Sequence, residues 1–72
     1  MIYHNIRHLR EDHDWTQQFV ADYLGVNRRT YSAYETGDIT MSPETLIQLS
    51  ELHRTSVDYL LGLTRVRNPY PR

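Results

Sequence analysis

The sequence of 72 residues predicts an all-α fold, built as one small helical bundle. Apolar residues recur at the three- and four-residue spacing that is typical of amphipathic helices. Residues that favour helix N-termini precede four of these segments, namely Thr16, Asn27, Ser42 and Ser56. Cysteine is absent, so packed helices are the economical way for a chain of this length to build a core.

The first predicted helix covers residues 2–12, and its apolar edge consists of Ile2, Ile6 and Leu9. Trp15 follows this helix and directly precedes the next N-cap. A large apolar side chain at that position favours packing into the core as a hydrophobic staple.

The second predicted helix begins after Thr16, whose hydroxyl can accept a hydrogen bond from the first turn. Its buried stripe consists of Val20, Ala21 and Leu24. Gly25 can adopt a positive φ without steric cost and therefore ends the helix. The turn continues through Val26 to Asn27, which caps the third helix.

The third predicted helix covers about residues 28–36 and ends at Gly37. Its inner side holds Tyr31, Tyr34 and Glu35. Tyr31 is expected in the core. Tyr34 is expected to be half-buried, with its hydroxyl free to reach a phosphate. The outer side and its flanks hold Arg28, Arg29, Thr30, Ser32, Ala33 and Thr36. Arginines at a helix N-terminus suit anions, and arginine can donate two hydrogen bonds to guanine in the major groove. This pattern indicates a DNA-reading helix.

A loop at residues 38–41 follows, and its backbone and Thr40 are candidates for phosphate contacts. Ser42 and Pro43 open a fourth helix, as a cap and a proline at the first position. Its residues expected to face inward are Leu46, Ile47, Leu49 and Leu52. Ser56 caps a short fifth helix. The residues of that helix expected to close the bundle are Val57, Leu60 and Leu61.

From about Ile6 to Gly62 the chain resembles the Cro/lambda-repressor type of helix-turn-helix, the Xre family of bacterial and phage regulators. The resemblance is carried by Leu9-Arg10, Thr16-Gln17, Val20-Ala21, Leu24-Gly25-Val26, Tyr34-Glu35 with Gly37, and residues 56–62. It implies a compact five-helix bundle of the lambda-repressor-like DNA-binding type, whose third helix enters the major groove. The implied function is a sequence-specific regulator of transcription that binds double-stranded DNA, and a repressor is expected.

The resemblance also implies roles for single residues. It places DNA contacts on Gln17, Asn27, Arg28, Arg29, Ser32 and Ala33. Gln17 is expected to meet phosphate and to brace a side chain of the third helix. Arg10 is expected to pair with Glu35, which would tie the first helix to the end of the third. Ala33 stands where the family often has a polar or basic residue, and Phe19 where it usually has a polar one, so the operator does not follow by analogy.

A homodimer is the expected assembly, because one domain reads few base pairs and two-fold pairing would place two recognition helices about 34 Å apart. The resemblance makes Tyr59, Leu63 and Val66 the first candidates for dimer contacts, and Phe19 is a second candidate. The alternative is an antitoxin or another protein-binding module on the same fold, which would have a protein partner.

Composition bears on the remaining function classes. The net charge of −1 is low for a DNA-binding domain, but residues 27–33 carry two arginines and no acid. Residues 1–62 are expected to form the domain, and residues 63–72 a basic tail with two prolines, which is expected to be solvated.

Enzyme activity is not expected, since no nucleophile motif, carboxylate pair or glycine-rich phosphate loop stands out. His4 and His8 have metal-ligand spacing but lack an evident third ligand, and His13 and His53 look isolated, with His53 half-buried. We therefore expect no metal and no cofactor.

No apolar run approaches the roughly 20 residues of a membrane span, and no signal-peptide pattern opens the sequence. A cytoplasmic protein of bacterial or phage origin is expected.

Overall fold

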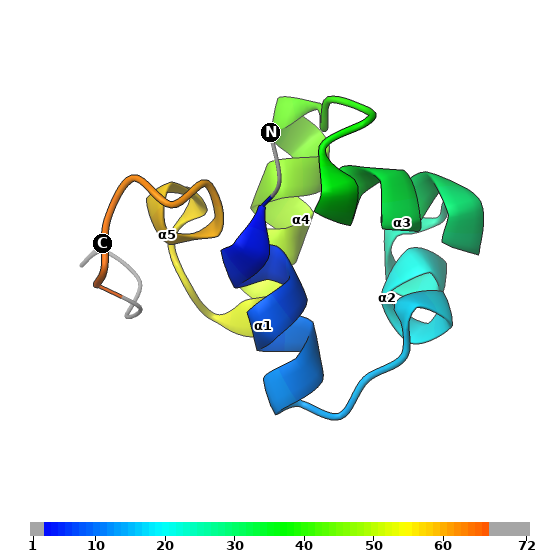
Figure 1. Cartoon of the computed structure of the whole chain (residues 1–72), viewed down its shortest axis with the longest axis horizontal. Helices are drawn as coiled ribbons and strands as arrows, with labels where there is room; N and C mark the ends of the chain where they lie inside the picture. The colour runs from blue at the N-terminus through cyan, green and yellow to red at the C-terminus, as the bar shows by residue number, and fades with distance from the viewer. Residues whose placement is uncertain (1–2, 67–72) are drawn as a thin grey trace.

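Five helices make up the part of the chain that the computed structural model describes, residues 3–66. They are α1 (His4–Asp12), α2 (Gln17–Leu24), α3 (Arg28–Thr36), α4 (Pro43–His53) and α5 (Val57–Leu60). In Figure 1, α2 and α3 form one side of the molecule, α1 and α4 its middle, and α5 the opposite side. The all-α prediction is confirmed. The predicted start of the first helix, Ile2, lies outside the described residues.

Four of the helices begin at the N-caps that the sequence predicts. The side chains of Thr16, Asn27, Ser42 and Ser56 each accept a hydrogen bond from the backbone N–H three residues later. These bonds satisfy donors that the first helical turn leaves unpaired. The first helix begins differently, because the backbone N–H of Tyr3 donates to the carbonyl of Glu35 over 3.2 Å. The start of α1 is thereby joined to the end of α3.

Two glycines set the ends of the helix-turn-helix. Gly25 and Gly37 have φ values of 73° and 81°, in the left-handed region that side chains with a Cβ disfavour. After each glycine the next backbone N–H turns back to the helix: Val26 donates to Ala21 over 3.0 Å, and Asp38 donates to Ala33 over 2.9 Å. Both ends are therefore closed by the same hydrogen-bonded turn.

The buried core brings all five helices together. Its apolar members are Ile6, Leu9, Val20, Ala21, Tyr31, Tyr34, Met41, Leu49 and Leu60. Tyr31 is fully buried, as expected. The prediction that Tyr34 is half-buried is wrong, because only 9% of it is exposed. Tyr34 lies one helical turn after Tyr31, so it shares the inward side of α3.

The fourth helix corrects another expectation. Leu49 is fully buried and Leu46 and Leu52 are partly buried against the core, but Ile47 is 51% exposed. Ile47 is two residues from Leu49, which places it about 200° around the helix from the most buried position. The prediction that Ile47 faces inward is therefore wrong.

Trp15 is partly buried and packs against the core, as the sequence predicts. Its ring stacks on His13, with centroids 4.2 Å apart, and lies 5.6 Å from His53 and 4.9 Å from Phe19. The rings of His13 and His53 are 5.7 Å apart, so the expectation that these histidines are isolated is wrong. His53 is also more buried than expected, with 7% of it exposed.

Within residues 3–66, no helix is both long enough and apolar enough to cross a membrane. The same range holds no group of three or more histidine, aspartate or glutamate side chains arranged to bind a metal ion. The rings of His4 and His8 have centroids 6.3 Å apart on α1.

Candidate nucleic-acid interface

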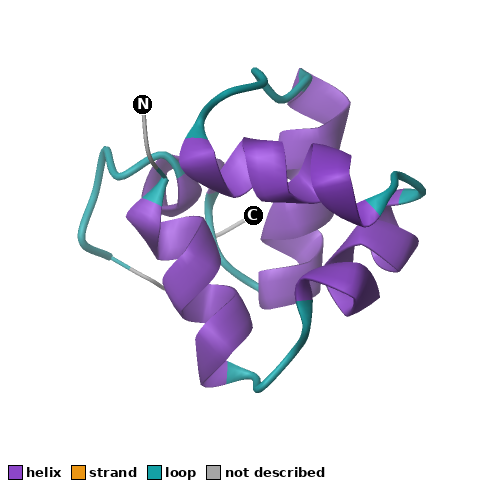
Figure 2. Ribbon diagram, turned by 45° about the vertical axis from the view of Figure 1, so that its right-hand side comes forward, coloured by secondary structure: helices purple, strands orange, loops and turns teal. Residues whose placement is uncertain are grey.

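The surface of α3 is the candidate interface. In Figure 2, α3 runs across the front of the molecule, with α1 and α2 below it and α4 behind. Arg28, Arg29 and Thr36 are exposed, whereas Thr30, Ser32 and Ala33 are of intermediate exposure. The two arginines thus stand at the N-terminal end, with smaller side chains behind them, which is a shape that lets a helix approach a groove closely.

A shallow hollow of about 300 Å³ runs along this surface. Its lining residues are Arg28, Arg29, Ser32, Ala33, Thr36 and Asp38. Five of the six are among the predicted DNA contacts, and α3 brings them together. The remaining four, Gln17, Asn27, Thr30 and Thr40, are not among these lining residues. Thr40 is exposed in the loop between α3 and α4.

Asp38 is a member of this surface that the sequence reasoning missed. The hydroxyl of Thr36 donates to Oδ2 of Asp38 over 3.0 Å, so the carboxylate closes the C-terminal end of the hollow. A carboxylate can accept a hydrogen bond from the amino group of cytosine and repels phosphate. The signal available in the sequence was its place directly after Gly37, where the turn folds the chain back along α3.

Arg10 and Glu35 hold α3 in place. Nε of Arg10 donates to Oε2 of Glu35 over 2.7 Å, and Nη2 donates to Oε1 over 3.3 Å. Nη1 of Arg10 also donates to the carbonyl of Trp15 over 2.9 Å. The ion pair implied by the family resemblance is therefore present, and it joins α1, the linker before α2, and α3. Only 13% and 5% of the two side chains are exposed.

Gln17 completes this connection from α2. Its Nε2 donates to Oε1 of Glu35 over 3.1 Å, so Gln17 does brace a side chain of α3. Three elements thus converge on one carboxylate directly behind the candidate interface. Such a network fixes the orientation of a binding element by holding its supporting side chains in one geometry.

The charges in this network are mutually stabilised. Burial alone would raise the pKa of Glu35, but the hydrogen bonds from Arg10 and Gln17, together with the nearby hydroxyl of Tyr31, outweigh it and hold that pKa below its ordinary value. Hydrogen bonding to Glu35 in turn raises the pKa of Arg10. Burial, reinforced by the Glu35 carboxylate, raises the pKa of Tyr31 well above its ordinary value. At neutral pH the network therefore holds an ionised carboxylate and a neutral tyrosine.

The predicted dimer contacts lie at the other side of the molecule. Leu63 and Val66 are 73% and 58% exposed, and they follow α5, which lies opposite α3 in Figure 1. Tyr59 is partly buried, and its carbonyl accepts a hydrogen bond of 2.7 Å from Nδ2 of Asn5. Phe19, the second candidate, is 48% exposed on α2.

Known proteins are similar to this chain in sequence. The chain is 38% identical over 64 residues to the HTH-type transcriptional regulator AnsR of Bacillus subtilis, a match that covers 89% of this chain and 55% of AnsR. It is 41% identical over 61 residues to the uncharacterised HTH-type regulator YqaE of the same organism, covering 85% of this chain and 53% of YqaE. The chain therefore spans about half the length of these curated relatives.

Two further matches extend the comparison. Antitoxin PezA of Streptococcus pneumoniae is 33% identical over 69 residues, which cover 96% of this chain and 44% of PezA. The crystal structure of a transcriptional regulator from Listeria innocua superposes with a TM-score of 0.80 at 26% identity, covering all of this chain and 65% of that one. The helix-turn-helix family model matches residues 6–60, which span all of α2, α3 and α4. The chain belongs to the Xre/lambda-repressor-like family of helix-turn-helix proteins.

Proposed function

We propose that this chain binds double-stranded DNA sequence-specifically and acts in transcriptional regulation, as a repressor. The observation that carries the proposal is the pair of exposed arginines at the N-terminus of α3, on a helix held from behind by Arg10, Glu35 and Gln17. A rigid helix with free donors at its tip is suited to the major groove. The names of AnsR and of the Listeria innocua protein support the same function.

In this proposal the side chains divide into two groups. Arg28 and Arg29 read base edges, with guanine as the preferred partner because its O6 and N7 accept two hydrogen bonds from one guanidinium. Ser32 and Ala33 lie behind them, and Ala33 offers an apolar contact to a thymine methyl. The residues assigned to the backbone and the groove edge are Gln17, Asn27, Thr30, Thr36 and Thr40. These contacts fix the register of the helix on the duplex.

The protein would act as a homodimer, because α3 alone contacts too few base pairs for useful selectivity. Leu63 and Val66 are exposed in the segment that follows α5, and α5 lies on the side away from α3, so this segment offers an apolar contact there. A two-fold arrangement through that side leaves both recognition helices free to bind successive major grooves. Such a regulator would work in the bacterial cytoplasm, where its DNA lies.

An antitoxin role is the second candidate, and the similarity to Antitoxin PezA favours it. In that case the same α3 would bind DNA while another surface binds a toxin protein. Stable co-purification of a second protein from the native host, in fixed stoichiometry, would distinguish this candidate from a regulator that works alone.

Selection of bound duplexes from a random DNA pool tests the proposal most directly. We expect a two-fold symmetric site with half-sites about one helical turn apart. Replacing either Arg28 or Arg29 with Ala should weaken binding to that site by about 1–3 kcal/mol and relax the preference at one position per half-site. Arg54→Ala is the matched control, since Arg54 is an exposed arginine that follows α4.

Thermal unfolding of the Arg28 and Arg29 variants should match that of the parent, because both side chains are exposed. A selection that enriches no sequence would contradict the proposal. So would a double Arg28→Ala, Arg29→Ala variant that discriminates the selected site as well as the parent does.

A further inference from the structure

Arg7 lies beside the candidate interface but is not among the predicted DNA contacts. It lines a hollow of about 390 Å³ between α1, α2 and α3. The lining residues are His4, Arg7, Arg10, Gln17, Glu35 and Thr36. Thr36 also lines the hollow along α3, so the two hollows adjoin. The wall that α1 contributes therefore continues the surface that we assign to DNA.

The two arginines of this wall differ in how they are held. The side chain of Arg10 is 13% exposed and committed to Glu35 over 2.7 Å. The side chain of Arg7 is 62% exposed, and its ion pair with Glu11, at 3.3 Å, involves a side chain that is 49% exposed. An exposed pair of this kind contributes little and is easily exchanged. Arg7 is thus the arginine in this hollow that can change partners.

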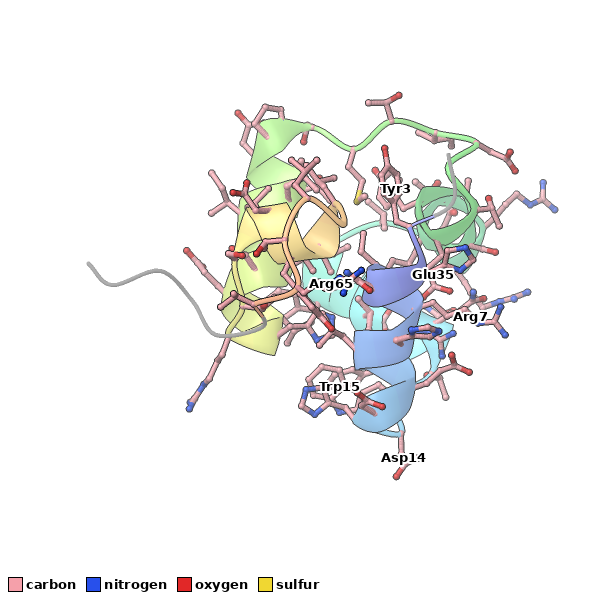
Figure 3. The ribbon with its side chains drawn as sticks, turned by 60° about the vertical axis from the view of Figure 1, so that its left-hand side comes forward. Tyr3, Arg7, Asp14, Trp15, Glu35 and Arg65 are labelled. Carbon is pink, nitrogen blue, oxygen red and sulfur yellow. The ribbon has the colours of Figure 1, made fainter. Side chains whose placement is uncertain are left out.

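The direction of the Arg7 side chain is compatible with an exchange of its partner. Figure 3 shows Arg7 projecting from α1 on the side where Glu35 lies, whereas Arg65 lies on the opposite side of that helix. The backbone hydrogen bond from Tyr3 to Glu35 holds the start of α1 against the end of α3. Arg7, one turn further along α1, therefore keeps a fixed position relative to the recognition surface.

We propose that Arg7 contacts a phosphate of the DNA strand that passes along the α1 side of α3, which makes α1 part of the interface. The inference rests on the proposed DNA binding and deepens it. A phosphate would replace Glu11 as the partner of the guanidinium, and the contact would release a counterion from the duplex. Because phosphates are the same at every base pair, Arg7 adds affinity and register without selecting sequence.

The test compares Arg7→Gln with the parent protein on the selected duplex, by fluorescence anisotropy over about 0.05–0.3 M salt. Loss of one phosphate contact should reduce the magnitude of the slope of log K against log salt by about 0.9. The same relation predicts binding about eightfold weaker at about 0.1 M salt. The ranking of mismatched sites should stay unchanged.

Two variants control the comparison. Arg54→Gln removes the same charge from an exposed arginine that does not line this hollow, and it should leave the slope at the parent value. Arg7→Lys keeps the charge and should keep the slope. Thermal unfolding should show Arg7→Gln folded as stably as the parent, since it loses only the exposed pair with Glu11.

The outcomes separate this inference from the proposed function. If the parent binds the selected duplex and Arg7→Gln has the parent slope, α1 makes no phosphate contact and the inference fails while the function stands. An equal loss of slope in Arg7→Gln and Arg54→Gln also overturns it, because the effect is then one of overall charge. A parent protein that binds no duplex overturns both.

Discussion

At the scale of single residues, the Glu35 carboxylate decides how α3 is held. It accepts hydrogen bonds from Arg10 and Gln17, and it is 5% exposed. Taking charges out of water is costly, so such a pair gains its value from orientation as much as from stability. Removing one partner leaves the other charge buried without compensation, and this is where substitution should be most damaging.

The two arginines of α1 allow a direct comparison. Arg10→Ala should lower the free energy of unfolding by about 3 kcal/mol, because it leaves Glu35 buried without its partner. Arg7→Ala should lower it by less than about 1 kcal/mol, because that pair is exposed. Urea denaturation of both variants measures the difference. Equal midpoints for the two would show that the Arg10–Glu35 pair does not support the fold.

The lowered pKa of Glu35 gives a pH dependence with a definite sign. A carboxyl whose pKa is lower in the folded state than its ordinary value of 4.5 stabilises the fold above that value, and the stabilisation is lost as the pH falls through the folded pKa. The stability difference between the parent and Glu35→Gln should therefore be largest at neutral pH and shrink below about pH 4.5. Urea denaturation from pH 7 down to pH 3 would measure it. A difference that stays constant over that range would show that Glu35 is not held ionised by its partners.

At the scale of elements, the helix-turn-helix repeats one local design. Each helix begins at a side-chain cap, and each ends at a glycine with positive φ followed by a hydrogen-bonded turn. These features are local in the chain, which is why the sequence predicts them well. The end of α4 is different, because Arg54 adopts a φ of 52° without any glycine to signal it. There the fold imposes a conformation that the residue type disfavours.

Substitutions of Asn27 can separate its role as the N-cap of α3 from its proposed contact with DNA. Its Oδ1 accepts the N–H of Thr30 over 2.8 Å, so Asn27→Ala should cost about 1 kcal/mol of stability. Asn27→Ser keeps a capping oxygen and should be nearly as stable as the parent. Thermal unfolding measures the first effect, and duplex binding by Asn27→Ser shows what the amide adds at the DNA. A stable Asn27→Ala variant would mean that the cap does not limit the stability of α3.

At the scale of the whole molecule, the bundle separates two surfaces. The candidate DNA surface lies on α3, whereas α5 lies on the opposite side, and the segment that follows it carries the exposed Leu63 and Val66. This separation would let a dimer form without covering the recognition helices. The candidate DNA surface carries both signs of charge: Arg28 and Arg29 stand at one end of the hollow and Asp38 closes the other, while the chain as a whole carries −1.

The dimer proposal predicts a specific defect. Leu63→Asp should weaken self-association by about tenfold or more, because burying a leucine is worth about 2 kcal/mol and a charge opposes burial. Sedimentation equilibrium measures the dissociation constant, and Phe19→Asp is the matched control on α2. A Phe19→Asp variant that dissociates while Leu63→Asp remains dimeric would move the interface to α2.

The sequence by itself determined the helices, because periodicity, caps and glycines act between residues a few positions apart. It also determined the two arginines at the start of α3, since their exposure follows from helical spacing. The resemblance to the Xre family supplied the Arg10–Glu35 pair, whose members are 25 positions apart and have no local signal.

The tertiary structure alone decided the remaining features. It brought Asp38 into the α3 surface and placed the rings of His13 and His53 close together beside Trp15. It also left Ile47 exposed and Tyr34 buried. It also placed Arg7 beside the end of α3. Each of these depends on which helix faces which, and that depends on the packing of distant segments, which a local pattern does not encode.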